Sequence, residues 1–198
     1  MLKIKDPELK LKNLKLDWGC GWNRESGFLG VDIKDLKCVD IVCDMEGILD
    51  LPDESCQIIR SQHFIEHLDI IEVIFIFEEW LRLLKVGGKL HIYFPDMALI
   101  QRYVNEARAL DFAFGQQVDS WDIHKSFWTL NTMEHYLSLC VENGFHYSKI
   151  KEIPFVSVHH HVIPTEKYFL DNDTLQGKVF NWTSGIEAIK AKKDEYAD

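Results

Sequence analysis

The sequence lacks the long apolar runs that cross a membrane. Its most apolar stretch, Ile70–Phe77, has eight residues and contains Glu72, whereas a transmembrane helix needs about 20. The segment Met1–Lys15 carries five lysines and no continuous apolar core, so we predict no signal peptide. We therefore expect no membrane insertion and a cytoplasmic location.

The sequence also lacks paired cysteines and an excess of basic charge. Its five cysteines are odd in number and form no C-x-x-C pair, which favours reduced thiols over disulfides. The 32 acidic residues outnumber the 22 basic ones and give a formal net charge of −10. We therefore expect no nucleic-acid partner. The chain shows no internal repeat and no low-complexity linker.

The 198 residues, 46% of them hydrophobic, are enough to bury the core of a single domain. Short apolar segments that end near glycine, proline or acidic residues are predicted as strands. They are Leu14–Trp18, Phe28–Ile33, Val39–Cys43, Cys56–Ser61 and Lys89–Phe94. The segments with helical periodicity are Ile70–Lys85, Met97–Asp111 and Thr129–Asn143. This alternation predicts an α/β fold with a parallel sheet and helices on its faces.

The two ends of the chain depart from that alternation. Residues 1–12 are charged and are predicted as a loose lead-in, and residues 156–184 as an irregular insertion. Phe145–Phe155 and Gly185–Ala191 are predicted to pair as the last strands. All of these segments are assigned to one domain, residues 1–198.

The first predicted helix has a polar face and a glycine stop. Glu72, Glu79, Arg82 and Lys85 fall on that face, and Gly87-Gly88 are expected to end the helix. The next helix carries an apolar stripe that begins at Ile100, and the last one carries Leu130, Met133, Leu137 and Cys140. Both stripes are expected to face the core.

The most informative segment is Leu16-Asp17-Trp18-Gly19-Cys20-Gly21, in which an apolar run ends in an acid and Gly-x-Gly. Glycines just past a strand let a ligand approach the backbone, because no Cβ stands in the way. The next apolar run ends in Asp32, and a carboxylate at the tip of a strand can accept both hydroxyls of a ribose. The pattern predicts a nucleoside site at the carboxyl ends of parallel strands.

The same segment disfavours a dinucleotide. The third glycine of the dinucleotide motif is replaced by Arg24, and Asp17 and Asp32 are only 15 residues apart where about 20 are usual. Six residues separate Gly21 from Phe28, too few for a crossover helix. A pyrophosphate would need the N-terminus of that helix. S-adenosylmethionine is a nucleoside ligand without phosphates.

Further motifs follow in a fixed order up to residue 96. They are Gly30-Val31-Asp32-Ile33, Cys43-Asp44-Met45, Leu51-Pro52-Asp53-Glu54-Ser55, Ser61-Gln62-His63-Phe64-Ile65-Glu66-His67-Leu68, Leu84-Lys85-Val86-Gly87-Gly88-Lys89-Leu90 and Phe94-Pro95-Asp96. In order and spacing the chain resembles the class I S-adenosylmethionine-dependent methyltransferases. The short first crossover resembles a type 11-like subgroup of short predicted methyltransferases, often associated with polysaccharide and cell-surface gene clusters. Gly115-Gln116 and Asp122-Ile123-His124-Lys125 match a later segment of that subgroup.

The resemblance implies a doubly wound, mostly parallel, Rossmann-like sheet with a shortened first crossover and a final antiparallel strand. It also implies S-adenosylmethionine as the cofactor and a small-molecule or saccharide-type acceptor, methylated on oxygen or nitrogen. The cofactor residues that it implies are Asp17, Gly19 and Gly21 at the methionine, Asp32 at the ribose, Asp44 and Met45 at the adenine, Ser61 and His63 after the fourth strand, and also Cys20 and Ile33. Trp18 and Trp22 stand where smaller residues are usual in the family, and they either stack on the ligand or crowd it.

Two histidine-containing segments allow other interpretations. His63-Phe64-Ile65-Glu66-His67 spells H-x-x-E-H, a zinc-protease signature. On one helix it would need a further carboxylate ligand such as Glu134 or Glu142. Because the segment follows an apolar strand, we expect His63 on a loop and predict no metal site. His159-His160-His161 suits a solvated edge or loop, with adventitious metal binding as the alternative. A non-catalytic partner module with this fold is the other open alternative.

Catalysis of methyl transfer rests mainly on positioning the acceptor and excluding water. A hydroxyl acceptor also needs a base with a pKa near the working pH, and histidine is the natural choice. His124 is our first candidate, followed by His63 and His67. The segment Phe114–Phe127 mixes polar and aromatic residues and is predicted to form a lid over the acceptor. An amine or carboxylate acceptor would need no base.

Overall fold

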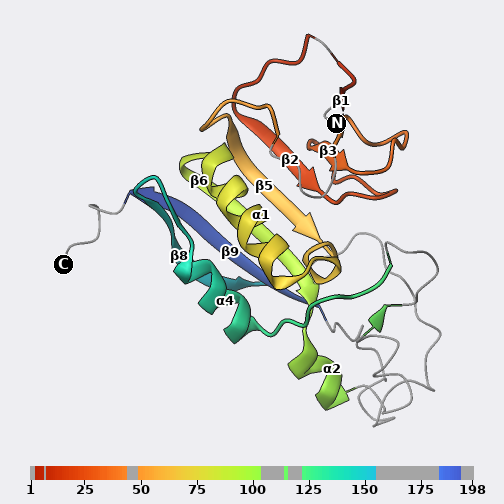
Figure 1. Cartoon of the computed structure of the whole chain (residues 1–198), viewed down its shortest axis with the longest axis vertical. Helices are drawn as coiled ribbons and strands as arrows, with labels where there is room; N and C mark the ends of the chain where they lie inside the picture. Colours follow the sequence, from red (N-terminus) through yellow and green to blue (C-terminus); the bar gives the residue numbers. More distant parts are fainter. Residues whose placement is uncertain are drawn as a thin grey trace.

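The computed structural model describes residues 3–6, 8–43, 49–103, 114–115, 122–154 and 183–192. These residues form a nine-stranded sheet in the order β1-β4-β3-β2-β5-β6-β9-β8-β7 (Figure 1). The strands are β1 (Lys3–Ile4), β2 (Leu14–Trp18), β3 (Leu29–Asp32), β4 (Ile41–Val42), β5 (Cys56–Gln62), β6 (Leu84–Pro95), β7 (Val141–Glu142), β8 (Phe145–Ile153) and β9 (Thr183–Lys192). The helices are η1 (Ile65–His67), α1 (Ile70–Leu83), α2 (Met97–Tyr103) and α4 (Leu130–Leu139).

The centre of the sheet is parallel and its far end is antiparallel. β4, β3, β2, β5 and β6 pair in parallel, and β9 then pairs antiparallel with both β6 and β8. The expected mostly parallel sheet is confirmed, and so is the pairing of the last strand with the segment that begins at Phe145. The chain from Gly19 to Phe28, between β2 and β3, contains no helix, as the short spacing predicts.

Helix α1 crosses the sheet in front of β5 and β6 (Figure 1). Asp69 caps its N-terminus by accepting hydrogen bonds from the backbone N–H groups of Ile71 and Glu72, while the Glu72 side chain accepts from the Asp69 backbone. This reciprocal capping box satisfies amides that a helix end otherwise leaves without partners. The buried face of α1 includes Phe77 and Trp80, which lie in the same hydrophobic core as Met133 and Leu137 of α4. The predicted core stripe of α4 is therefore confirmed.

Two details of the sequence prediction are wrong. The lead-in is not wholly loose, because β1 pairs antiparallel with β4. On the predicted polar face of α1, the Glu79 side chain is buried and accepts hydrogen bonds from the Leu49 amide and from Arg82. The helix α1 ends at Leu83, before the two glycines. Gly87 lies instead within β6, at a φ of +77°, where the register with β5 shifts.

Several expectations lie wholly or partly outside the described residues. They are the continuation of the helix 97–111 beyond Tyr103, the centre of the lid 114–127, most of the insertion 156–184, and the run His159-His160-His161. Within the described part of the chain, no helix is long and apolar enough to cross a membrane.

Candidate functional site

A pocket lies at the carboxyl ends of β2, β3 and β5. It holds about 760 Å³ of space not filled by protein atoms, including its open mouth. The end of β2 and the loop after it contribute Trp18, Gly19, Gly21 and Trp22; the end of β3 contributes Asp32, Ile33 and Lys34; and the turn after β5 contributes His63, Phe64 and His67. Leu36 and Cys43 complete the lining. Ligands of open α/β sheets bind outside these strand ends, so the location is that of a ligand site.

The glycines of the loop after β2 have backbone conformations that other residues rarely adopt. Gly19 has a φ of +68° and Gly21 a φ of +53°. A Cβ on Gly19 would lie 2.4 Å from Cδ2 of Phe64, whereas a Cβ on Gly21 would have no neighbour within 4 Å. Gly19 therefore lets the loop pack against the turn after β5, and Gly21 leaves open space above the pocket.

Asp32 holds this loop in place. Its Oδ2 accepts a hydrogen bond from the Gly21 amide at 2.8 Å, and its Oδ1 accepts one from the Lys34 amide at 2.9 Å. Each carboxylate oxygen has a second lone pair, so the side chain can still accept hydroxyl groups from the pocket. The open Gly21 backbone and the acceptor capacity of Asp32 are compatible with the predicted ribose site, which stays a prediction.

The two tryptophans beside the glycines have different environments. Trp18 is 3% exposed, and its ring meets the edge of Trp80 with 5.8 Å between the ring centres. Trp22 is 75% exposed at the edge of the pocket. Trp18 therefore belongs to the core, and Trp22 offers an aromatic face to a ligand.

Three of the residues named for the cofactor do not line the pocket. Asp17 is buried behind the loop, where it pairs with Arg60 at 2.7 Å and accepts from the Glu25 amide. Burial raises the pKa of Asp17 even though Arg60 opposes that shift. Burial and the nearby acids likewise raise the pKa of Cys20, which keeps its thiol protonated. Ser61 is 1% exposed. Asp44 and Met45 lie outside the described residues.

The turn after β5 contains the H-x-x-E-H segment, but not on one helix. His63 has a φ of +50° and precedes η1, which begins at Ile65. This placement confirms the expectation that His63 lies on a loop. Its Nδ1 lies 3.3 Å from Oε1 of Glu66, and its Nε2 lies 3.2 Å from the hydroxyl of Thr183 on β9. A helical zinc-protease arrangement is therefore wrong for this segment.

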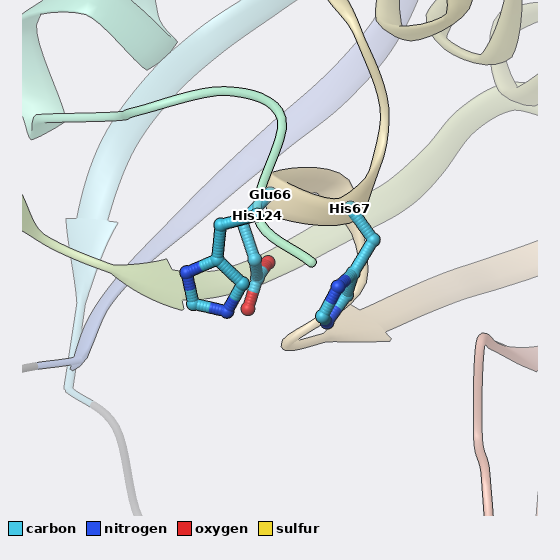
Figure 2. Close-up of side chains that lie close together, drawn as sticks. All are labelled: Glu66, His67 and His124. Atoms are coloured by element: carbon cyan, nitrogen blue, oxygen red, sulfur yellow. The ribbon is translucent and has the colours of Figure 1, made fainter. Parts of the chain in front are cut away.

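His124 lies beside the pocket, next to His67. The ring centres of the two histidines are 5.0 Å apart. The backbone amides of Lys125 and Ser126 both donate to the carbonyl oxygen of Glu66, at 2.7 and 3.1 Å, and hold the His124 segment against η1. Figure 2 shows the side chains of Glu66, His67 and His124 gathered in one place.

Glu66 is the buried member of that group. It is 2% exposed, and its Oε2 has no hydrogen-bond partner within the described residues. Burial alone would raise the pKa of Glu66, but the hydrogen bond with His63 and the imidazoles of His67 and His124 outweigh burial and lower it. The carboxyl group is therefore an anion surrounded by imidazoles. Sequence spacing gives no sign of this group, because His124 is 57 residues from His67.

Comparison with known proteins identifies solved structures with a similar fold. No family model and no curated protein matches the sequence. A S-adenosylmethionine-dependent methyltransferase from Archaeoglobus fulgidus is similar at a TM-score of 0.54 and 16% identity, over 90% of this chain and 86% of that one. One from Mesorhizobium loti is similar at a TM-score of 0.54 and 16% identity, over 90% and 91%.

A third solved structure contains ligands. It is the phosphoethanolamine N-methyltransferase 2 of Haemonchus contortus, in complex with phosphomonomethylethanolamine and S-adenosylhomocysteine, with a TM-score of 0.53 and 16% identity over 94% of this chain and 50% of that one. The chain therefore has the Rossmann-like fold of the class I S-adenosylmethionine-dependent methyltransferases.

Proposed function

We propose that the protein is a S-adenosylmethionine-dependent methyltransferase that acts on a hydroxyl or amine of a small-molecule or saccharide-type acceptor. The observation that carries this proposal is the pocket at the ends of β2 and β3. There Gly19 and Gly21 open the backbone and Asp32 presents a carboxylate to it. The pocket lies at the ligand-binding edge of a fold that S-adenosylmethionine-dependent methyltransferases share.

The lining residues suit the parts of S-adenosylmethionine. Asp32 would hold the ribose hydroxyls with the acceptor capacity that its two backbone hydrogen bonds leave. The loop from Gly19 to Gly21 would lie along the methionine part, and the exposed ring of Trp22 would cover an apolar face of the ligand. When bound, the cofactor supplies a methyl group on a cationic sulfur. Asp44 and Met45 remain our proposed neighbours of the adenine.

The other wall of the pocket would receive the acceptor. His67 lines that wall and His124 stands beside it, and both come from segments that hydrogen bonds of the Glu66 backbone hold together. We assign the activation of a hydroxyl acceptor to His124. Positioning of the acceptor and exclusion of water would account for much of the remaining rate enhancement.

Calorimetry with S-adenosylmethionine and S-adenosylhomocysteine tests the proposal. Both ligands should bind, and binding should survive treatment with a chelator, because the lining residues hold the cofactor without metal. Asp32→Ala should weaken binding on the order of tenfold or more, since hydrogen bonds to a charged group contribute about 1.5–3 kcal/mol each.

Asp50→Ala is the matched control, since Asp50 is exposed and does not line the pocket. The affinity of the Asp50→Ala variant for both ligands should equal that of the wild type. No heat and no thermal shift with either ligand would overturn the proposal. Binding without turnover of labelled cofactor over a broad panel of acceptors would favour the non-catalytic module instead.

A further inference from the structure

We propose that Glu66, His67 and His124 form a binding site for a divalent transition metal ion, of the zinc class, at the acceptor wall of the pocket. One ligand atom from each of these side chains lies within 4.8 Å of those of the other two. In the described part of the chain, no other group of histidine, cysteine and carboxylate side chains meets this spacing. The site departs from the expectation that the protein has no metal, and it differs from the H-x-x-E-H arrangement because His124 replaces His63.

A hydrogen bond to a backbone carbonyl favours the tautomer of His67 that can bind a metal. Its Nδ1 lies 3.3 Å from the carbonyl oxygen of Ile123. A carbonyl oxygen can only accept, so Nδ1 carries the proton, and in the neutral imidazole Nε2 is then the nitrogen with the lone pair. Histidines that bind metals almost always donate their other ring N–H to a carbonyl or carboxylate in this way. The tautomer of His67 is therefore that of a metal ligand through Nε2.

Glu66 supplies a second, independent indication. Its Oε2 is buried and has no hydrogen-bond partner within the described residues, while its Oε1 contacts His63. Buried polar atoms without partners are rare, because leaving one unpaired costs free energy. A cation held by Oε2 would give that oxygen its partner and would balance the charge of the carboxylate.

The two imidazoles have the separation that a shared ion requires. Rings that each bind one tetrahedral zinc ion at about 2.0–2.1 Å have centres roughly 5 Å apart. The observed distance between the ring centres of His67 and His124 is 5.0 Å, with the ring planes at 76° to one another. Figure 2 shows the Glu66 carboxylate beside the His124 ring, with the His67 ring facing both. Bonds of this length to one ion would place the ligand atoms roughly 3.3 Å apart, so side-chain rotations must draw them in from the 4.8 Å within which they now lie.

The backbone fixes these ligands from two distant parts of the chain. Glu66 and His67 belong to η1, and the amides of Lys125 and Ser126 donate to the Glu66 carbonyl. The Ser126 hydroxyl donates to the carbonyl of Ile65 at 3.1 Å. Because the hydrogen bonds join the two segments on either side of the ligands, the site needs little ordering on binding.

The set of ligands indicates which metal binds and what it would do. Two imidazole nitrogens and one carboxylate oxygen suit zinc, and three protein ligands leave a position open, as in catalytic rather than structural sites. His67 also lines the pocket, so the open position lies at the acceptor wall. There the ion would bind the oxygen of an acceptor hydroxyl and ease the loss of its proton to water. With the ion bound, His124 would therefore activate the acceptor as a ligand of the ion and not by taking the proton itself. This last step rests on the proposed methyltransferase function; metal binding itself does not.

The experiment must exclude metal binding elsewhere in the chain. His159-His160-His161 is a run of histidines that can bind metal adventitiously. All measurements therefore use a background protein in which these residues are alanine. Zinc is titrated by calorimetry without any cofactor, cobalt is titrated by its visible absorption, and the bound metal is counted by elemental analysis.

We expect one zinc or cobalt ion per chain of the background protein, with a cobalt spectrum of low coordination number. Glu66→Gln and His124→Ala should each weaken binding tenfold or more, and magnesium should not compete. His135→Ala removes an exposed histidine of α4 and should leave the affinity within twofold. Because Glu66 is buried, His67→Ala serves as a second variant, and circular dichroism checks that each variant folds.

Two outcomes would overturn the metal site. One is the absence of a stoichiometric ion in the background protein. The other is an affinity that the three cluster variants do not change while they remain folded. Neither result would contradict the proposed methyltransferase function, because cofactor binding is measured separately and without metal. Conversely, a protein that binds zinc here but fails to bind S-adenosylmethionine would retain the site and lose the proposed function.

Discussion

The two walls of the pocket are built in different ways. The wall proposed for the cofactor comes from one continuous stretch, residues 18–36, and its chief features are backbone conformations at Gly19 and Gly21 and the carboxylate of Asp32. The wall proposed for the acceptor is lined by His67 of η1, and His124 and the buried Glu66 stand beside and behind it. One wall is local in sequence and the other is assembled by the fold.

This difference suggests a division of labour. A wall made of backbone and one carboxylate recognises parts of a ligand that do not vary, such as a ribose. A wall made of imidazoles and a buried carboxylate can move protons or hold an ion. If the division holds, changes in one wall should affect binding of the cofactor, and changes in the other should affect turnover.

The largest effect is expected at the acceptor wall. His124→Ala should lower kcat for a hydroxyl acceptor by about 10²–10⁴, the usual contribution of assisted proton transfer, whether His124 takes the proton itself or holds the ion that eases its loss. The Kd for the cofactor should stay within about twofold, because His124 does not line the part of the pocket around Asp32. Single-turnover kinetics and calorimetry on the same preparation measure both quantities.

A purely structural His124 gives the opposite pattern. The variant would then lose thermal stability, while the rate per folded molecule would stay close to that of the wild type. A large rise in the cofactor Kd would erase the contrast between the walls, because it would mean that both bind the same ligand.

A smaller effect, on cofactor binding, is expected from the glycines. Gly19→Ala combines a left-handed backbone with a Cβ placed 2.4 Å from Cδ2 of Phe64. Overpacking of this kind costs about 1–3 kcal/mol and the backbone strain about 1–2 kcal/mol more. We expect a lower melting temperature and a cofactor affinity reduced on the order of tenfold or more.

Gly21→Ala is the matched control for that variant. It carries the same backbone strain, but its Cβ would meet nothing within 4 Å, so its stability should fall less. Equal losses of stability in the two variants would show that the packing of the loop against Phe64 has no importance. A preserved kcat with saturating cofactor in either variant would sharpen the distinction between the walls.

The local wall could be predicted from the sequence because its signals are close together. β2 has the predicted bounds Leu14–Trp18, and the loop and Asp32 follow within 15 residues of Asp17. The placement of Asp17 behind the loop could not be predicted, because its partner Arg60 lies on β5. The fold pairs the two only after the strands have formed.

The acceptor wall could be predicted only in part. The sequence indicates His63, His67 and His124 as candidate bases, but it gives no reason to join Glu66 to His124. Their proximity depends on backbone hydrogen bonds between η1 and residues 125 and 126. The burial of Glu79 could not be predicted for a similar reason: periodicity places Glu79 on a polar face, and the Leu49 amide that donates to it is 30 residues away in the sequence.

The smallest predicted effect concerns a charged group outside both walls. Glu187 of β9 is 6% exposed and accepts hydrogen bonds from His91 at 2.8 Å and Lys89 at 3.0 Å, with Lys151 at 3.1 Å. Burial alone would raise its pKa, but these partners hold the pKa at about 2, against 4.5 for a free glutamate. The charged form is thus favoured in the folded state.

The sign of the pH dependence follows from that lowered pKa. The stabilisation by Glu187 is fully present above pH 4.5 and is lost as the pH falls toward about 2. The side chains of Lys89 and Lys151 are 46% and 62% exposed, so water screens their charges, and we expect Glu187→Gln to cost only on the order of 1 kcal/mol at pH 7. That corresponds to a fall of about 2–4 °C in melting temperature. The difference in stability between Glu187→Gln and the wild type should shrink below pH 4.5. The control variant Glu152→Gln, which changes an exposed residue of the neighbouring strand β8, should show no such difference.

Cofactor affinity and kcat at pH 7 should equal those of the wild type in both variants. A change in either would mean that the antiparallel end of the sheet contributes to the pocket, and the comparison between the two walls would then have to include a third region.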